Sequence, residues 1–342
     1  MRRELLALLC ETPGAPGYED AIRDVVVREL EPHVDELSVD PLGSVIAVRK
    51  GGGGPRVMVA AHMDELGFMV SHVDDEGFVR VITLGGFDPA TLVAQRVIVH
   101  GREDVLGVMG IKPVHLKTED ERKRVPKPED LFIDLGLPAD RVNELVRKGD
   151  PVTRERSLAD LGDLVTCKSI DNRAGLYVMI EAIRALGDHA CEVVAVATTQ
   201  EEVGVRGARV ASARVEPDIG LNIDTTTAHD VPGSKPHERV TTLGGGAAIK
   251  VYDSGVIVQR AVRDHLVAVA ESRGIPFQME IMTRGGTDTR EMQLSGKGAL
   301  AGGVSIPTRY LHQVVECCHP GDLDAAVALV AAFCETAHDL VP

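Results

Sequence analysis

Polar side chains that could bind metal ions follow three apolar segments of the sequence. Imidazole and carboxylate groups together form the ligand sets of catalytic zinc sites, and cobalt and manganese accept similar ligands. Short apolar segments are typical of buried strands, whose carboxyl ends form the ligand-binding crevice of an open α/β sheet. The segments and the residues after them are RVMVAA (56–61) before His62 and Asp64, VVAVATT (193–199) before Glu201 and Glu202, and IGLNI (219–223) before Asp224.

Two further residues extend this set. Asp171 follows the segment CKSI and begins an amphipathic helix, and His312 follows GGVSIPTRYL. Each residue alone has an ordinary explanation, because aspartate commonly caps helices and most histidines bind no metal. Carboxylates gathered at buried strand ends are nevertheless costly without a counter-charge. Two divalent cations would supply that charge, and the absence of cysteine from the set argues against a closed structural zinc site.

The elements around these residues predict an α/β domain that carries an insertion. Residues 1–66 contain two helical and two strand patterns, and long helices and buried strands return after residue 163. Residues 67–162 consist of short alternating segments separated by Gly, Pro and Asp, which is typical of a small β unit. We predict a catalytic domain with a mixed sheet flanked by helices, formed by 1–66 and 163–342, and an inserted small β-barrel-like domain, formed by 67–162.

Composition excludes several classes of partner. The formal charge of −15 repels phosphate backbones and anionic lipid, so we expect no nucleic-acid partner. No segment approaches the roughly 18 uninterrupted apolar residues of a membrane span, and the N-terminus does not resemble a secretory signal. The six cysteines lack CxxC spacing, which favours reduced thiols. We therefore expect a cytoplasmic protein with no membrane partner.

Six ordered motifs resemble those of a known enzyme family. The sequence is similar over nearly its whole length to cytosolic aminopeptidases that form tetrahedral twelve-subunit particles, a dinuclear-zinc family that includes glutamyl, leucyl and lysyl aminopeptidases. This family belongs to the wider group of zinc-dependent leucyl aminopeptidases and carboxypeptidases. The motifs are AAHMDELGFMV (60–70), SIDNRAG (169–175), TTQEEVGVRGA (198–208), NIDTT (222–226), RGGTDT (284–289) and TRYLHQVVE (308–316).

The resemblance implies a role for each polar residue at a matching position. A carboxylate would bridge two divalent cations, most simply Zn²⁺ with Co²⁺ or Mn²⁺ as alternatives, and each cation would receive a histidine and a further acid. A second acid would orient the first histidine, and a glutamate would act as the general base. The implied assignments are Asp171 as the bridge, His62 and Asp224 on one ion, Glu202 and His312 on the other, Asp64 as the orienting acid, and Glu201 as the base.

The implied reaction is hydrolysis of the amino-terminal residue of short peptides by a water that bridges the two cations. The substrate's α-amino group would bind one metal ion. Gly285, Gly286, Thr287 and Asp288 match a glycine-rich segment that contacts substrate in this family, although an ordinary turn would explain the same residues. The inserted unit would mediate self-association, with a homododecamer built from dimers as the expected particle, while a substrate lid or a simple elaboration are the alternatives.

Two positions depart from the family pattern. Gln313 and Val314 follow the last histidine where a Ser-Pro pair is usual, and Asn172 stands where a second acid is common. Neither change removes an implied ligand, but both could alter metal choice or substrate preference.

Two other functions are alternatives for this sequence. A glycan hydrolase would use paired acids, but these must flank the scissile bond at about 5–9.5 Å from each other, which suits the adjacent Glu201 and Glu202 poorly. The absence of tryptophan also weakens sugar stacking. An inactive assembly or binding protein of the same fold is the second rival, and the intact ligand and base positions argue against it.

Overall fold

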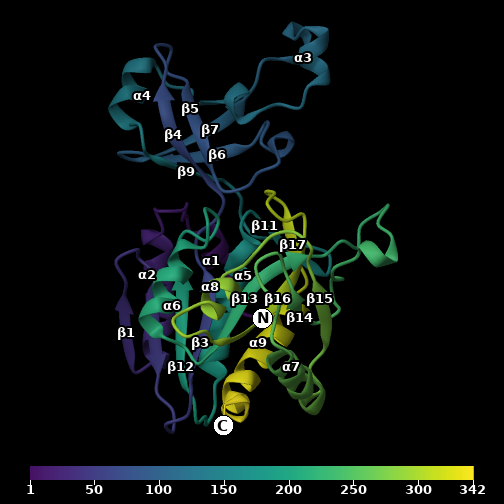
Figure 1. The fold of residues 1–342 in the computed structure, drawn as a ribbon. Helices are drawn as coiled ribbons and strands as arrows, with labels where there is room; N and C mark the ends of the chain where they lie inside the picture. The colour runs from purple at the N-terminus through teal and green to yellow at the C-terminus, as the bar shows by residue number, and fades with distance from the viewer. Residues whose placement is uncertain (342) are drawn as a thin grey trace.

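A computed structural model describes residues 1–341 of the chain. The chain forms a helix-covered α/β body and a closed six-stranded barrel, which lies at one end of the body above the ends of its central strands (Figure 1). Among residues 1–341, no helix combines the length and apolar character that crossing a bilayer requires. The predicted fold class, a mixed sheet flanked by helices with an inserted β barrel, is confirmed.

The body is built on an eleven-stranded mixed sheet. Its four central strands, β12, β3, β13 and β16, run parallel, and their apolar sequences match a sheet that is buried on both faces. The path across the sheet is β1 (Glu36–Val39), β2 (Val45–Arg49), β12 (Glu192–Thr198), β3 (Arg56–His62), β13 (Ile219–Thr227), β16 (Leu300–Arg309), β17 (Glu316–Cys318), β11 (Leu164–Cys167) and β10 (Ala159–Leu161), with β14 (Ala247–Tyr252) beside β16 and β15 (Phe277–Ile281) beside β14.

Helices cover both faces of this sheet. Alternate residues of β3 point to opposite sides, so that Val57 and Val59 join the larger core while Met58 and Ala60 join the smaller one. The larger core contains residues of α1 (Arg3–Glu11), α2 (Asp20–Leu30), α5 (Ile170–Ala185), α7 (Arg260–Arg273) and α9 (Pro320–Thr336), and the smaller core contains residues of α6 (Arg206–Val215) and α8 (Thr289–Gln293).

The inserted unit is a barrel with its own core. Closure pairs every strand on both sides, which leaves no open sheet edge. Phe68, Val97 and Ile133 are among its buried core residues. In order around the barrel the strands are β4 (Gly67–Val73), β5 (Val79–Leu84), β8 (Phe132–Asp134), β7 (Asp104–Gly110), β6 (Arg96–His100) and β9 (Pro151–Arg154), with helices α3 (Glu119–Lys123) and α4 (Ala139–Leu145) in the connections.

The division into 1–66 with 163–342 and 67–162 stays a prediction. The barrel strands begin at Gly67 and end at Arg154. The last strand within the range 67–162, β10, instead pairs with β11 in the large sheet. The chain therefore returns to the body several residues before the predicted boundary.

A buried ionic cluster lies between β14 and β15. The Nζ atom of Lys250 lies 2.5 Å from Oε1 of Glu280 and 3.5 Å from Oδ2 of Asp253, and all three side chains are fully buried. Removing one partner of such a cluster leaves buried charge without compensation.

We expect Lys250→Met to lower the free energy of unfolding by about 3–5 kcal/mol, because two carboxylates would remain buried without their cation. Urea-induced unfolding followed by circular dichroism measures this change. The exposed Lys297→Met serves as the matched control and should be close to neutral. A loss below about 1 kcal/mol for Lys250→Met would contradict the importance of the cluster.

Candidate metal centre

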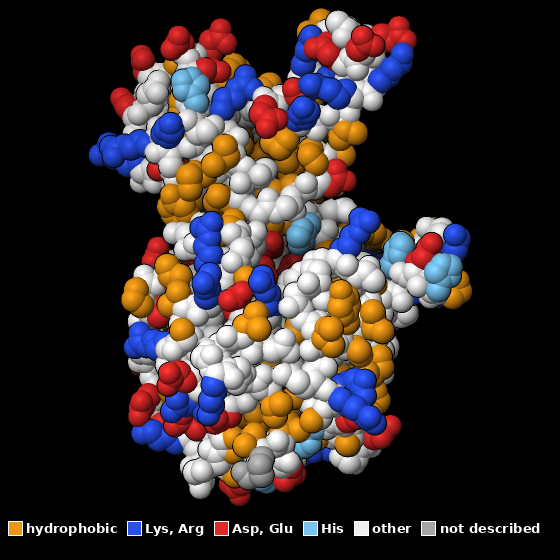
Figure 2. Space-filling model, in the orientation of Figure 1, with side chains coloured by type: hydrophobic (Ala, Val, Ile, Leu, Met, Phe, Trp, Pro, Cys, Tyr) orange, Lys and Arg blue, Asp and Glu red, His pale blue; other side chains and the backbone are white. Residues whose placement is uncertain are grey.

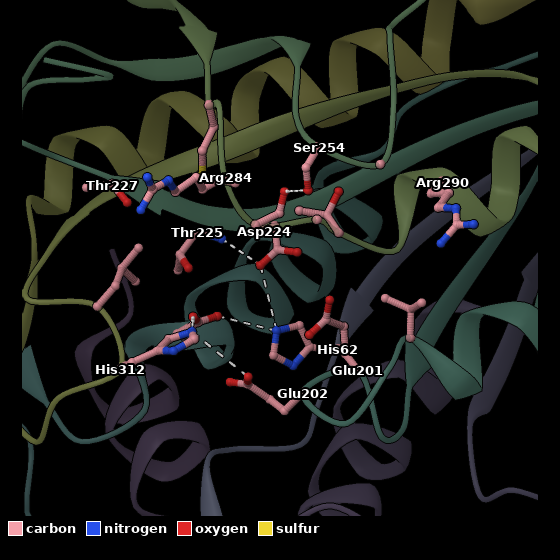
Figure 3. Close-up of a pocket in the computed structure, with 18 of the residues that line it drawn as sticks. His62, Glu201, Glu202, Asp224, Thr225, Thr227, Ser254, Arg284, Arg290 and His312 are labelled. Carbon is pink, nitrogen blue, oxygen red and sulfur yellow. Dashed lines mark hydrogen bonds and ion pairs between the residues drawn. The ribbon is translucent and has the colours of Figure 1, made fainter. Parts of the chain in front are cut away.

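Asp171 lies between two histidines at the carboxyl ends of the central strands. Its Oδ1 atom is 3.3 Å from Nε2 of His62, and its Oδ2 atom is 3.5 Å from Nε2 of His312. The two oxygens of one carboxylate thus face two different imidazoles. Figure 3 shows both histidine rings turned toward the interior of the site.

Two outer carboxylates complete the cluster. Oδ1 of Asp224 lies 3.7 Å from Nε2 of His62, and Oε2 of Glu202 lies 3.9 Å from Nε2 of His312. Single ligand atoms of His62, Asp171 and Glu202 also lie within 4.8 Å of one another. Asp224 thus lies beside His62 and Glu202 beside His312 (Figure 3), while Glu202 also approaches His62.

The sheet explains why residues so distant in sequence meet. His62 is the last residue of β3 and is in register with Thr198 at the end of the parallel strand β12, so the chain reaches Glu201 and Glu202 at the same edge. Asp224 lies in β13, which also runs parallel to β3. The convergence expected from the strand ends is what the structure displays.

The connecting segments adopt unusual backbone conformations. Gln200 and Val205 flank the glutamate pair with φ angles of 55° and 49°, and Tyr310 and His312 have φ angles of 60° and 64°. This left-handed region is uncommon for residues other than glycine and is often found at functional sites. The peptide bond between Asp171 and the next residue is cis.

Asn172, which departs from the family pattern, links two elements of the site. Its Nδ2 donates a hydrogen bond to the Ile223 carbonyl at 2.8 Å, and its Oδ1 accepts from the Gly175 amide at 3.0 Å. The side chain therefore connects the start of α5 to β13. An amide can both donate and accept, whereas an ionised acid at this position could only accept.

Asp64 holds the backbone of the two glutamates. Its Oδ1 accepts a hydrogen bond from the Glu201 amide at 3.0 Å, and its Oδ2 accepts from the Glu202 amide at 3.1 Å. Oδ1 is also 3.5 Å from Nδ1 of His62, while the Asp64 carbonyl oxygen lies 3.1 Å from the same nitrogen. The predicted role of the Asp64 carboxylate in orienting His62 stays a prediction, whereas its two hydrogen bonds to the Glu201–Glu202 turn are contacts that the sequence did not indicate.

Glu316 is a second organising residue, and sequence reasoning missed it. Its Oε2 accepts a hydrogen bond from the Asp171 amide at 2.9 Å, and its Oε1 accepts from the His312 amide at 2.8 Å. The side chain is buried. Glu316 is the last residue of the motif TRYLHQVVE, and its place in that motif, shortly after His312, was the available signal.

The ionisable groups of the site perturb one another strongly. Burial and the charge of Asp171 raise the pKa of Glu202 to about 8. Burial raises the pKa of Asp224 to about 7, and it raises the pKa of Glu201 well above its usual range. Burial opposes protonation of His312, but contact with Asp171 prevails and raises the pKa of that imidazole to about 10.

The residues present fit divalent cations. Within residues 1–341, Oδ1 of Asp171 and Oε1 of Glu202 are buried and accept no hydrogen bond. Buried carboxylate oxygens without partners are costly, and a bound cation would compensate several of them together. The donors are imidazole nitrogens and carboxylate oxygens, which suit zinc and neighbouring transition metals.

A cavity of about 970 Å³ opens onto this cluster. In Figure 2, acidic and histidine side chains are visible in a recess between the barrel and the body. Of the glycine-rich segment, Gly285, Gly286 and Thr287 line the cavity. Asp288 does not; it is fully buried, and its Oδ2 accepts a hydrogen bond from Thr198 Oγ1 at 2.5 Å.

The cavity wall also contains residues that the sequence did not single out. Arg284 and Arg290 line it from opposite sides (Figure 3). Val205, Met282 and Leu311 add apolar surface. The cavity therefore combines a polar floor with a mixed wall, which suits a short peptide better than an extended apolar ligand.

An α/β sheet whose strand ends gather histidines and carboxylates beneath such a cavity defines a metal-dependent hydrolase of the zinc-peptidase type. Comparison with known families makes the assignment specific. The model of the M42 glutamyl aminopeptidase family matches residues 43–329, and the chain belongs to this family. The predicted family and the predicted peptide-bond hydrolase are thereby confirmed, and the family depends on divalent metal cations.

Individual relatives agree over nearly the full chain. The lysyl aminopeptidase of Pyrococcus furiosus is 37% identical, with 97% of this chain and 96% of the relative covered. The solved structure of an aminopeptidase from Desulfurococcus kamchatkensis has 40% identity and a TM-score of 0.94, with 97% and 94% covered. The TET1 peptidase of Pyrococcus horikoshii, which can assemble into a tetrahedron or a large octahedral shell, has 32% identity and a TM-score of 0.88, with 98% and 99% covered.

Proposed function

We propose that the protein is a dinuclear metalloaminopeptidase in which Asp171 bridges two cations. His62 and Asp224 would hold one ion, and Glu202 and His312 would hold the other. The observation that carries this proposal is that the two oxygens of Asp171 face two different histidines, at 3.3 and 3.5 Å. Zinc suits these ligands best, with cobalt or manganese as alternatives.

Glu201 is the proposed general base. When bound, divalent cations supply positive charge that acidifies water and polarises a peptide carbonyl. Glu201 lines the cavity, and the hydrogen bond from its amide to Asp64 holds its backbone at the edge of the site. Its carboxylate would accept a proton from water and transfer that proton to the leaving amine.

The proposed substrates are short peptides with a free amino terminus. The backbone of Gly285 and Gly286 can approach a substrate closely, because neither residue has a side chain. Among the described residues other than its chain neighbours, Gly286 has only the Ser254 hydroxyl within 4 Å of where a Cβ atom would lie, so this part of the wall is open. The α-amino group would bind at the metal centre, which would restrict cleavage to the first residue.

We also propose that the subunits form a homododecamer through the barrel. The support is the similarity to the Pyrococcus horikoshii TET1 peptidase, whose assembly is tetrahedral or octahedral. Static light scattering at micromolar concentration measures the mass directly, and a monomer would contradict this part of the proposal.

A cytoplasmic location is likewise a proposal. All six cysteines are free thiols and all are buried within residues 1–341. Unpaired cysteines are typical of reducing compartments.

A substrate panel with metal exchange tests the proposed activity. The purified protein should hydrolyse aminoacyl p-nitroanilides. Chelation should remove roughly 90% or more of this activity, and addition of zinc, cobalt or manganese should restore it. Peptides with an acetylated amino terminus are the matched control and should remain intact. Hydrolysis of soluble glucans without release of p-nitroaniline would instead support the glycan-hydrolase alternative.

A further inference from the structure

The barrel touches the proposed metal centre through two glycines that follow β5. The carbonyl oxygen of Gly86 lies 2.7 Å from Nδ1 of His312. With Nδ1–H donating to this carbonyl, Nε2 is the ring nitrogen that faces Asp171 and Glu202. The barrel thus supplies the acceptor that would select the tautomer of one proposed ligand.

The preceding glycine contacts the other proposed ligand of the same ion. Gly85 has a φ angle of 96°, and a Cβ atom at this position would lie 2.2 Å from Cδ2 of Leu66 and 3.3 Å from Cβ of Glu202. The segment is therefore packed directly against Glu202. His62 and Asp224, the proposed ligands of the other ion, instead arise from β3 and β13 of the central sheet.

Phe87 anchors this segment to the base of the barrel. Its ring stacks on Phe68 of β4, with centroids 4.7 Å apart and planes inclined by 9°. The guanidinium of Arg154, at the end of β9, lies 5.4 Å from the centroid of Phe87, within the range of a cation–π contact. Arg154 is buried, and it donates a hydrogen bond to the Lys168 carbonyl at 2.6 Å, three residues before Asp171.

We propose that Phe87 is a positioning residue for the metal centre. By fixing the Gly86 carbonyl it orients the ring of His312, so that the barrel sets the affinity for the ion at Glu202 and His312. The ion at His62 and Asp224 does not depend on it. This inference rests on the proposed two-metal function, and it gives the barrel a role within the subunit that is separate from assembly.

The expected loss of metal affinity in a Phe87 variant follows from the known effect of hydrogen bonds to metal ligands. Loss of a partner that orients a ligating histidine typically weakens metal affinity by about 10–100-fold. Phe87→Ala should produce a loss of this size for one of the two ions and leave the other unchanged. Phe87→Tyr keeps the ring and should retain both affinities.

Phe78 provides the matched control. It precedes β5 at the end opposite to Gly85 and packs edge-on against Phe132, with ring centroids 5.1 Å apart. Phe78→Ala also removes one phenyl ring from the barrel domain, so it reports any general effect of weakened barrel packing. Its zinc affinities should match those of the wild type.

Zinc affinities of the intact protein are measured by competition with a fluorescent chelator, with light scattering on the same samples. Adding Glu202→Gln to Phe87→Ala should weaken further only the ion that Phe87→Ala already weakens, and the affinity of the other ion should stay that of the wild type. The proposal is overturned if Phe87→Ala binds both ions normally, if Phe78→Ala loses the same ion, or if the ion is lost only when subunits dissociate. Wild-type protein that binds fewer than two ions would instead refute the proposed two-metal function.

Discussion

We expect Glu201→Gln to reduce kcat by about 10²–10⁴-fold while the metal content stays that of the wild type. Glutamine has the shape of glutamate but cannot accept the proton of an attacking water. The hydrogen bond from the residue 201 amide to Asp64 does not involve the side chain, so the local backbone should persist. Initial rates on an aminoacyl p-nitroanilide, together with elemental analysis of bound metal, measure both effects.

The surface variant Glu271→Gln is the matched control, because it removes the same charge from an exposed position on α7. Its rate and metal content should equal those of the wild type. Two results would change the assignment of Glu201. Retention of more than about a hundredth of the rate would contradict a general base, and loss of metal would indicate a ligand instead.

Asp171→Asn should empty the site of both ions and abolish turnover. The two oxygens of Asp171 face His62 and His312, and an asparagine keeps only one oxygen and no charge. The remaining residues then lose the shared ligand that would bring two cations together. Elemental analysis after dialysis against a defined free zinc concentration measures the loss, and circular dichroism shows whether the fold persists.

Asp288→Asn is the control for this change. Asp288 is also a fully buried carboxylate near the site, with a hydrogen bond from Thr198, but it does not line the cavity. Its variant should keep both ions. If Asp171→Asn retained two ions, the bridging role would be wrong, whereas loss of both ions from the two variants alike would indicate a general effect of removing buried charge.

The convergence of the proposed ligands could be predicted because it follows from the order of buried strands. β3, β12 and β13 are short apolar segments, and each is followed by or contains acids or histidine near its carboxyl end. Parallel strands place those ends at one edge of the sheet, independently of the conformation of the loops. The short alternating segments of residues 67–162 likewise indicated a separate β unit. They did not indicate that β10 pairs with the large sheet.

Contacts that depend on loop conformation could not be predicted. Thr287 and Asp288 are neighbours, yet the first lines the cavity and the second faces Thr198 behind it. No periodic pattern specifies which way consecutive residues point outside helices and strands. The contacts made by Glu316 and Gly86 depend in the same way on the left-handed conformation of His312, which sequence does not reveal.

The carboxylate of Asp64 accepts hydrogen bonds from two consecutive amides, those of Glu201 and Glu202. The backbone positions of these two residues are therefore coupled, even though separate roles are proposed for their side chains. A substitution that moves the backbone of Glu201 to admit a bulkier substrate would therefore also displace Glu202. Variants with altered specificity should therefore arise more readily at cavity residues outside this turn, such as Met282 and Arg284, whose side chains can change without disturbing it.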